Sequence, residues 1–85
     1  MVEKKLIGMI SHFYPKISVA VVDLTDTLRV GDKISIERSS GTFEQVVDSM
    51  QIEHENVQEA KKGQSIGLKI SEVTREGAKV FKVIE

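Results

Sequence analysis

A tight turn that leads directly into an alternating strand, at residues 27–36, constrains the fold of this chain most strongly. Gly31 can adopt a positive φ without a Cβ clash, and Asp32 can accept hydrogen bonds from nearby main chain, so the pair predicts a sharp corner. Beyond it, Ile34 and Ile36 alternate with polar residues, which is the two-residue period of a half-buried strand. The stretch therefore favours a β-rich fold built around corners.

The spacing of glycine, proline and apolar residues predicts further strands. A second glycine-punctuated stretch, residues 62–70, predicts turns at Gly63 and Gly67. Gly8 indicates a β-bulge or the close approach of another backbone, and Pro15 is expected to stop the first strand. The six predicted strands cover residues 3–11, 17–24, 33–38, 43–52, 65–70 and 79–84.

Residues 43–60 fit two kinds of secondary structure. The apolar residues of this segment fit one face of a helix, and residues 43–52 fit a strand about equally well. Periodicity alone therefore does not decide between helix and strand. A Val-Val pair and a polar loop at residues 53–56 favour the strand. Residues 56–62 fit one helical turn.

The length and composition limit the class of protein. Eighty-five residues suffice for one small core, so we expect a single domain over residues 1–85. Six short strands with glycine corners favour an all-β fold, a single six-stranded antiparallel closed barrel. The chain has no Cys, and His12 and His54 lack ligand-like neighbours, so no metal site is expected. No apolar run approaches the roughly 18 residues of a membrane span, and we expect a cytoplasmic chain without membrane contact.

Charge is unevenly distributed along a chain whose formal net charge is −1. Residues 39–60 carry five carboxylates and no Lys or Arg, whereas residues 61–82 carry six basic and two acidic side chains. Solvated strand faces are the simplest interpretation. The alternative is a surface for RNA phosphates, formed by Lys69, Lys79 and Lys82 if the last two strands present them on one side.

Two aromatic residues, Phe13 and Tyr14, precede the only proline. The position predicts that they plug one end of the barrel. Alternatively, they are the contact residues for a stacked base or the anchor for a protein partner, because aromatic side chains concentrate binding energy in both kinds of interface.

Catalytic and nucleotide-binding motifs are not found. No Gly-x-x-x-x-Gly-Lys-[Ser/Thr] is present to cradle nucleotide phosphates. Residues 63–67 match Gly-x-Ser-x-Gly, but neither His nor Asp follows Ser65, and a strand is expected where the nucleophile elbow requires a helix. We expect no enzymatic activity, no nucleotide and no cofactor.

Four segments, residues 28–34, 47–50, 59–68 and 76–77, together resemble the second, β-barrel domain of translation GTPases of the elongation factor Tu and initiation factor 2 type. The chain also resembles small stand-alone translation elongation factor-like proteins and the barrel at the C-terminus of some U32-type peptidases. The resemblance covers nearly the whole chain. It implies a six-stranded translation-protein barrel and a strand at residues 43–52.

The same resemblance implies a non-catalytic binding module that contacts tRNA, ribosomal RNA, the ribosome or a translation-associated protein. The positions that match the seat of the tRNA 3′ end are Gln51, His54 and Ser65, where the elongation factor usually has an acid, an arginine and an asparagine. The alternative is a protein-interaction or accessory barrel that acts in trans on an enzyme, equivalent to the domain that U32-type peptidases carry.

Overall fold

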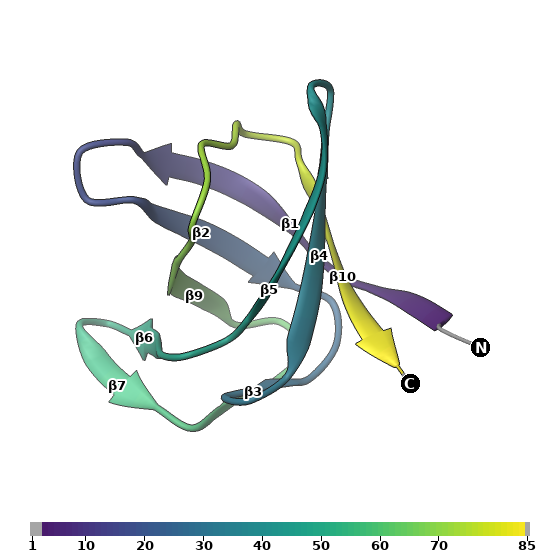
Figure 1. Cartoon of the computed structure of the whole chain (residues 1–85). Coiled ribbons are helices and arrows are strands. Elements are labelled where there is room, and N and C mark those ends of the chain that lie inside the picture. Colours follow the sequence, from purple (N-terminus) through teal and green to yellow (C-terminus); the bar gives the residue numbers. More distant parts are fainter. Residues whose placement is uncertain (1–2, 85) are drawn as a thin grey trace.

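The computed structural model describes residues 3–84, and all regular secondary structure in that range is β-strand (Figure 1). Every paired strand runs antiparallel to its neighbour, which confirms an all-β, antiparallel fold. The strands are β1 (Glu3–Tyr14), β2 (Val19–Leu24), β3 (Leu28–Arg29), β4 (Lys33–Arg38), β5 (Gly41–Val46), β6 (Met50–Ile52), β7 (Glu55–Val57), β8 (Glu59–Ala60), β9 (Ser65–Lys69) and β10 (Lys79–Ile84).

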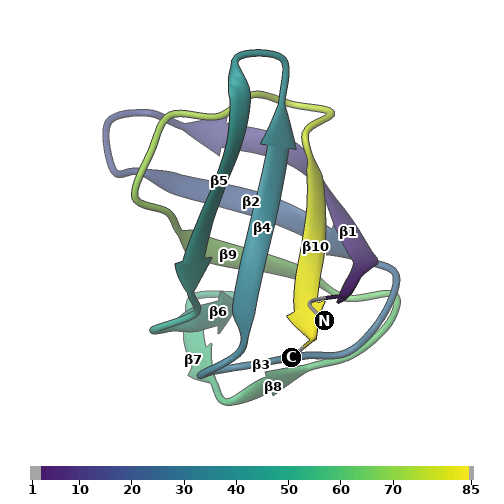
Figure 2. The same ribbon diagram turned by 45° about the vertical axis from the view of Figure 1, so that its right-hand side comes forward.

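Within residues 3–84, eight of the strands form one curled sheet in the order β5-β4-β10-β1-β2-β9-β6-β7. Figure 2 shows β5, β4 and β10 in front of β1, β2 and β9, with the two-stranded ribbon of β3 and β8 along the lower end. The sheet is open, because β5 and β7 remain as edges and no ladder joins them. The expected closed six-stranded barrel is therefore not confirmed.

The Gln45 side chain bridges the open seam between β5 and β9. The Gln45 carboxamide donates from Nε2 to the Lys69 carbonyl (2.9 Å) and accepts at Oε1 from the Ser71 amide (2.8 Å). These are the two hydrogen bonds that a peptide group of a neighbouring strand would make. A side-chain amide thus joins the edge strand β5 to the end of β9, at a place where a closed barrel would have a backbone ladder.

The predicted strand over residues 43–52 is divided in two, because residues 47–49 leave the ladder. The Val47 amide and carbonyl are used by the corner instead: Val47 N donates to Asp32 O and Gly31 N donates to Val47 O, both at 2.8 Å. After the break, β6 pairs with β9 and β7, so neither residues 43–52 nor residues 56–62 are helical. The single helical turn predicted at 56–62 is wrong, since Val57 pairs with Met50 and the following two-residue strand β8 pairs with β3.

The corner at Gly31 is confirmed. Gly31 has a φ of +97°, and the Arg29 amide donates to Asp32 Oδ2 at 2.9 Å. Gly63 likewise turns the chain, with a φ of +90°. Gly67, by contrast, lies inside β9 and not in a turn, so that part of the prediction is wrong.

The ends of the first two strands differ from those predicted. β1 continues to Tyr14, directly before Pro15, and β2 begins at Val19, so Ile17 lies in the connecting turn. The bulge predicted at Gly8 is confirmed by a register shift between Leu6 and Gly8. A Cβ at Gly8 would lie 2.8 Å from the Asp23 carbonyl oxygen, so glycine is required there by a close backbone approach.

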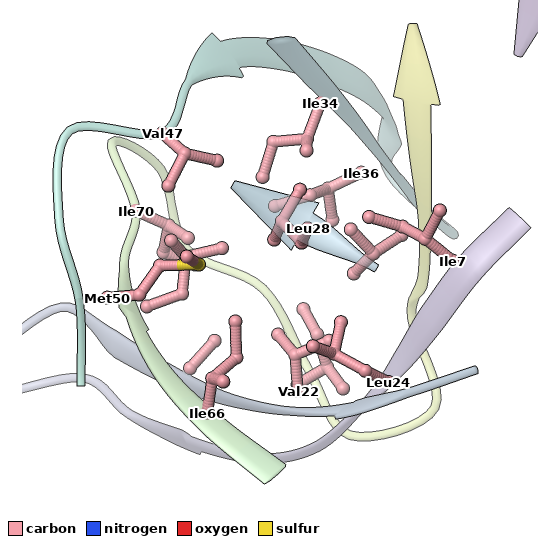
Figure 3. Packing of buried hydrophobic residues seen from close by; sticks show 14 of the residues in the cluster. Ile7, Val22, Leu24, Leu28, Ile34, Ile36, Val47, Met50, Ile66 and Ile70 are labelled. Atoms are coloured by element: carbon pink, nitrogen blue, oxygen red, sulfur yellow. The ribbon is translucent and has the colours of Figure 1, made fainter. Parts of the chain in front are cut away.

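The core fills the inside of the curled sheet (Figure 3). Alternate residues of the long strands point inward, as the two-residue period predicts, and the closing ribbon adds Leu28 and Ala60. The side chains labelled in Figure 3 point toward a common centre and come from most of the strands and from the segments that follow β5 and β9: Ile7, Val22, Leu24, Leu28, Ile34, Ile36, Val47, Met50, Ile66 and Ile70.

Candidate functional site

A hollow of about 400 Å³ lies on the outer face of the sheet, over β2, β9 and β6. Its floor is formed by Val19, Val21 and Gly67. The turn between β1 and β2 lines it with Tyr14 and Ile17, whose side chains are 47% and 61% exposed. The turn between β6 and β7 lines it with Glu53 and His54, and the other lining residues are Gln51, Ser65 and Ile66.

Strand register explains why these residues meet. Val21 lies opposite His12 of β1 on one side and Gly67 of β9 on the other, and Gly67 in turn lies opposite Gln51 of β6. Residues that are directly opposite in a ladder point to the same face of the sheet. Four strands, β1, β2, β9 and β6, therefore contribute neighbouring side chains to one outer surface.

The opposed residues just named form a central row across the outer face. The next outward-facing row on one side contains Tyr14, Val19 and Lys69, and the next row on the other side contains Asp23 and Ser65. Of the candidate residues named from the sequence, five thus lie in or beside the hollow. They are Tyr14, Gln51, His54, Ser65 and Lys69.

Gly67 leaves the floor of the hollow without a side chain, although the fold does not require glycine at this position. It is not among the positive-φ glycines, and an added Cβ would meet only Val19 Cγ1 at 3.6 Å and Gln51 O at 3.9 Å, which are ordinary contacts. Glycine within a strand weakens it and often marks a place where a ligand or another backbone approaches closely. The position is therefore more readily explained by an occupant of the hollow than by the packing of this chain.

The wall formed by Glu53 and His54 is conformationally strained. The two residues have φ values of +50° and +66° and form the whole loop between the paired residues Ile52 and Glu55. Two-residue hairpin loops with two positive φ values strongly favour Asn-Gly or Asp-Gly. Non-glycine residues in this region cost about 1–2 kcal/mol each, and such strain is concentrated at functional sites.

Polar groups around the hollow are tied to one another. The Ser65 hydroxyl donates to Asp23 Oδ1 at 2.7 Å, and Gln51 Nε2 donates to Asn56 Oδ1 at 3.2 Å. Because Ser65 already donates its proton to a carboxylate and is followed by strand β9, the Gly-x-Ser-x-Gly sequence does not have the geometry of a nucleophile elbow.

The expected basic surface of Lys69, Lys79 and Lys82 is not formed. Lys82 lies opposite Ile34 on the core-facing side of β10, and its Nζ pairs with Asp32 Oδ2 at 3.3 Å at the end of the sheet. Lys79 points outward, but β1 and β2 separate its strand from β9, which carries Lys69. The physical reason is the pleat: residues 79 and 82 are an odd number apart, so they face opposite sides of one strand.

Phe13 and Tyr14 also separate. Phe13 is partly buried against the core cluster, whereas Tyr14 lies beside His12, with ring centroids 4.3 Å apart, and lines the hollow. His12 Nδ1 is in turn 3.1 Å from Glu76 Oε1. The plug predicted for this end of the sheet is therefore supplied by Phe13, and the exposed aromatic surface by Tyr14.

Ile17, Val19, Val21 and Glu53 line the hollow but were not predicted from the sequence as site residues. The sequence of β2 does indicate a second apolar surface, because the strand is apolar on both faces. Ala20 and Val22 point inward, and Val19 and Val21 point outward. Strands apolar on both faces are typical of sheets covered on both sides. Here the described chain covers only one face.

Two other site classes find no support in the part of the chain that the structure describes. Residues 3–84 contain no group of three or more His, Asp or Glu residues placed to hold a metal ion. Over the same residues, no helix has the length and apolarity that crossing a bilayer demands.

No family model matches the chain. The chain is 44% identical over 80 residues to an uncharacterized protease of Methanocaldococcus jannaschii, a match that covers 93% of this chain and 20% of the protease. The chain thus spans about a fifth of the length of the curated relative that it matches.

Two crystal structures of the C-terminal domain of a Geobacillus thermoleovorans protein described as a U32 peptidase share the fold. The selenomethionine variant superposes with a TM-score of 0.85 over 89% of this chain and 96% of that one, and the second structure with 0.86 over 92% and 91%; both are 18% identical in sequence. At 18% identity, these two structures show that the fold is shared. They give no support to the translation-factor assignment or to a tRNA or ribosome partner.

Proposed function

We propose that this chain is a non-catalytic accessory domain that works with a peptidase-type enzyme and binds polypeptide through the hollow over Val19, Val21 and Gly67. The observation that carries the proposal is the apolar outer face of β2, which the fold leaves uncovered between Tyr14 and the strained turn at Glu53. The 44% identity to a protease and the fold shared with a U32 peptidase C-terminal domain support the association with peptidases.

The composition of the hollow favours polypeptide over RNA. Among the described residues, those that line it include one carboxylate, that of Glu53, and no Lys or Arg. RNA binding depends on cationic side chains that neutralise phosphates, whereas protein interfaces are built on buried aromatic and aliphatic anchors with a polar rim. Tyr14 and Ile17 are such anchors, and Gln51, Glu53 and Ser65 form the polar rim.

NMR titration tests the proposal directly. A permanently unfolded polypeptide, with its cysteines blocked by neutral alkylation, is added to labelled chain at about 50 and 200 mM salt. We expect amide shifts at Val19, Val21 and Gly67, with little dependence on salt because the central contact is apolar. Gly67→Leu should abolish these shifts while the chain stays folded, because its side chain would fill the hollow from below.

The matched control is Thr42→Leu, which adds the same side chain to an exposed position on β5, away from the hollow. It should leave the titration unchanged. Total tRNA is the competing ligand: shifts that appear only with tRNA and disappear at the higher salt would contradict the proposal. Incubation of the chain with the same polypeptide, followed by mass spectrometry, tests the non-catalytic part, and cleavage products that Ser65→Ala removes would contradict it.

A further inference from the structure

The hollow has acidic side chains at one end and basic side chains at the other. At one end, Asp23 and Ser65 lie opposite each other across β2 and β9. At the other end, Lys69 lies opposite Val19, which itself lies opposite Tyr14. The acidic and basic ends are therefore four residues apart along each strand, or about 13 Å at the rise of a β-strand.

The neighbouring turns increase this polarity. β6 runs antiparallel to β9 with Gln51 opposite Gly67, so Glu53, two residues later, lies toward the Ser65 end, where it lines the hollow. Lys16 belongs to the exposed turn that follows Tyr14, at the Lys69 end. Two carboxylates thus flank one end of the apolar floor, and two ammonium groups flank the other.

We infer, on the basis of the proposed function, that the hollow selects an extended polypeptide segment whose alternate side chains are basic, large and apolar, and acidic. In an extended segment, side chains two residues apart point to the same side and are separated by about 6.7 Å. A segment that lies along β2 and β9 with its apolar side chain over Gly67 places the flanking residues i−2 and i+2 over the two charged ends. The segment can run in either direction, because the charge pattern and not the backbone polarity is matched.

The two kinds of contact have different effects on binding. The apolar side chain displaces water from Val19 and Val21 and supplies most of the affinity. Exposed ion pairs are weak, so each matched charge is worth only about two- to five-fold in affinity, and the charges mainly determine which segment binds.

Fluorescence anisotropy with four labelled heptapeptides at about 50 mM salt tests the inference. The peptides are Ser-Lys-Ser-Leu-Ser-Glu-Ser, the forms with two Lys or two Glu at the flanking positions, and the mixed form with Ala in place of Leu, all with neutral ends. We expect the mixed peptide to bind several-fold more tightly than either same-charge peptide, and the Ala form to bind about tenfold or more weakly.

A charge-reversal variant gives a test that loss of folding cannot mimic, because it should change the ranking of the peptides and not abolish binding. In Lys69→Glu the basic end loses its net positive charge, since Lys16 and the new carboxylate cancel, so the mixed peptide should lose its advantage over the peptide with two Lys. The control is Lys79→Glu, an equal charge change on the outward side of β10, which should leave the ranking as in the original chain. The inference is overturned if Lys69→Glu keeps the original ranking or if the two same-charge peptides bind as well as the mixed one.

The two proposals fail in distinguishable ways. If unfolded polypeptide shifts Gly67 in the NMR titration and the peptides show no charge preference, the selectivity inferred here is wrong and the proposed function stands. If neither the polypeptide nor any peptide binds and tRNA does, both are wrong.

Discussion

The inner face of β2 and β9 is apolar, and so is the outer face of β2 at Val19 and Val21, but only the inner face is covered by this chain. Inside, Ala20, Val22 and Leu68 are fully buried in the core cluster. Outside, Val19 and Val21 are only partly buried and form the floor of the hollow. Apolar side chains that the fold leaves partly open to solvent contribute less to its stability than fully buried ones, so we interpret the outer pair as a binding surface.

Two glycines differ in the same way, since one is required by the fold and the other is not. Gly31 has a left-handed backbone that the corner requires, whereas Gly67 has an unstrained backbone and room for a side chain. Glycine at position 31 therefore serves the fold. At position 67 it costs the strand some stability and keeps the hollow open.

The largest expected effect is that of Leu68→Ala, which removes a fully buried side chain from the inner face. Leu→Ala substitutions in protein cores lower the free energy of unfolding by about 2–5 kcal/mol, through lost burial and the cavity that remains. Val21→Ala on the outer face should cost clearly less, about 1 kcal/mol, because that side chain is only partly buried. Urea denaturation of both variants measures the difference, and equal costs would show that the two faces contribute alike to stability.

Gly31→Val should lower the free energy of unfolding by about 1–3 kcal/mol, because a β-branched residue is strained at a φ of +97°. Gly67→Val should leave it unchanged or raise it by about 0.5–1 kcal/mol, since valine suits a strand and its Cβ meets only ordinary contacts. Chemical denaturation of the two variants compares them directly. A destabilised Gly67→Val would mean that the glycine serves packing and not an occupant.

Replacing Glu53 and His54 together by Asn and Gly should raise the free energy of unfolding by about 1 kcal/mol, because the new pair accepts positive φ at both positions. Polypeptide binding should weaken at the same time, since two lining side chains are lost. The control is Ser40→Gly, in a hairpin turn where the serine has no positive φ, and it should give no gain. If the variant is more stable but binds polypeptide as tightly as the original chain, the strained turn is not part of the binding site.

The smallest expected effect lies outside both faces, at Asp26. The ion pair with Lys5, and then a hydrogen bond from the Thr27 amide, hold the pKa of the Asp26 carboxyl below its ordinary value. Because the pKa is lower in the folded state than in the unfolded state, the stabilisation is present above the ordinary Asp pKa and is lost as the pH falls through the folded-state pKa. Asp26→Asn should therefore be slightly less stable than the original chain at neutral pH.

That difference should be smaller at acidic pH than at neutral pH, because protonation of the folded carboxyl removes its ion pair with Lys5. Thermal melts at both pH values, repeated in a Lys5→Met background where the difference should shrink, measure it. Polypeptide binding should not change, and a binding defect in Asp26→Asn would extend the site beyond the outer face of β2 and β9.

Much of the local structure could be predicted from the sequence, because neighbouring residues encode it. The strands at Lys33–Arg38 and Lys79–Ile84 have the predicted bounds, and the corner at Gly31 and the bulge at Gly8 follow from what only glycine can adopt. The spacing of Lys79 and Lys82 could also have shown that they face opposite ways, since it is an odd number of residues on one pleated strand.

The tertiary structure alone determined the open sheet and the site. Val47 leaves its predicted strand because its main chain bonds to a corner some fifteen positions earlier, and Gln45 bridges the resulting seam to β9. Tyr14, Gln51 and Ser65 meet because β1, β2, β9 and β6 are neighbours in the sheet, an order that depends on how the whole core packs. Side-chain period is a property of a few adjacent residues, whereas strand pairing is decided by contacts between distant segments, so the sequence determined the strands themselves and the fold determined which outer side chains share one surface.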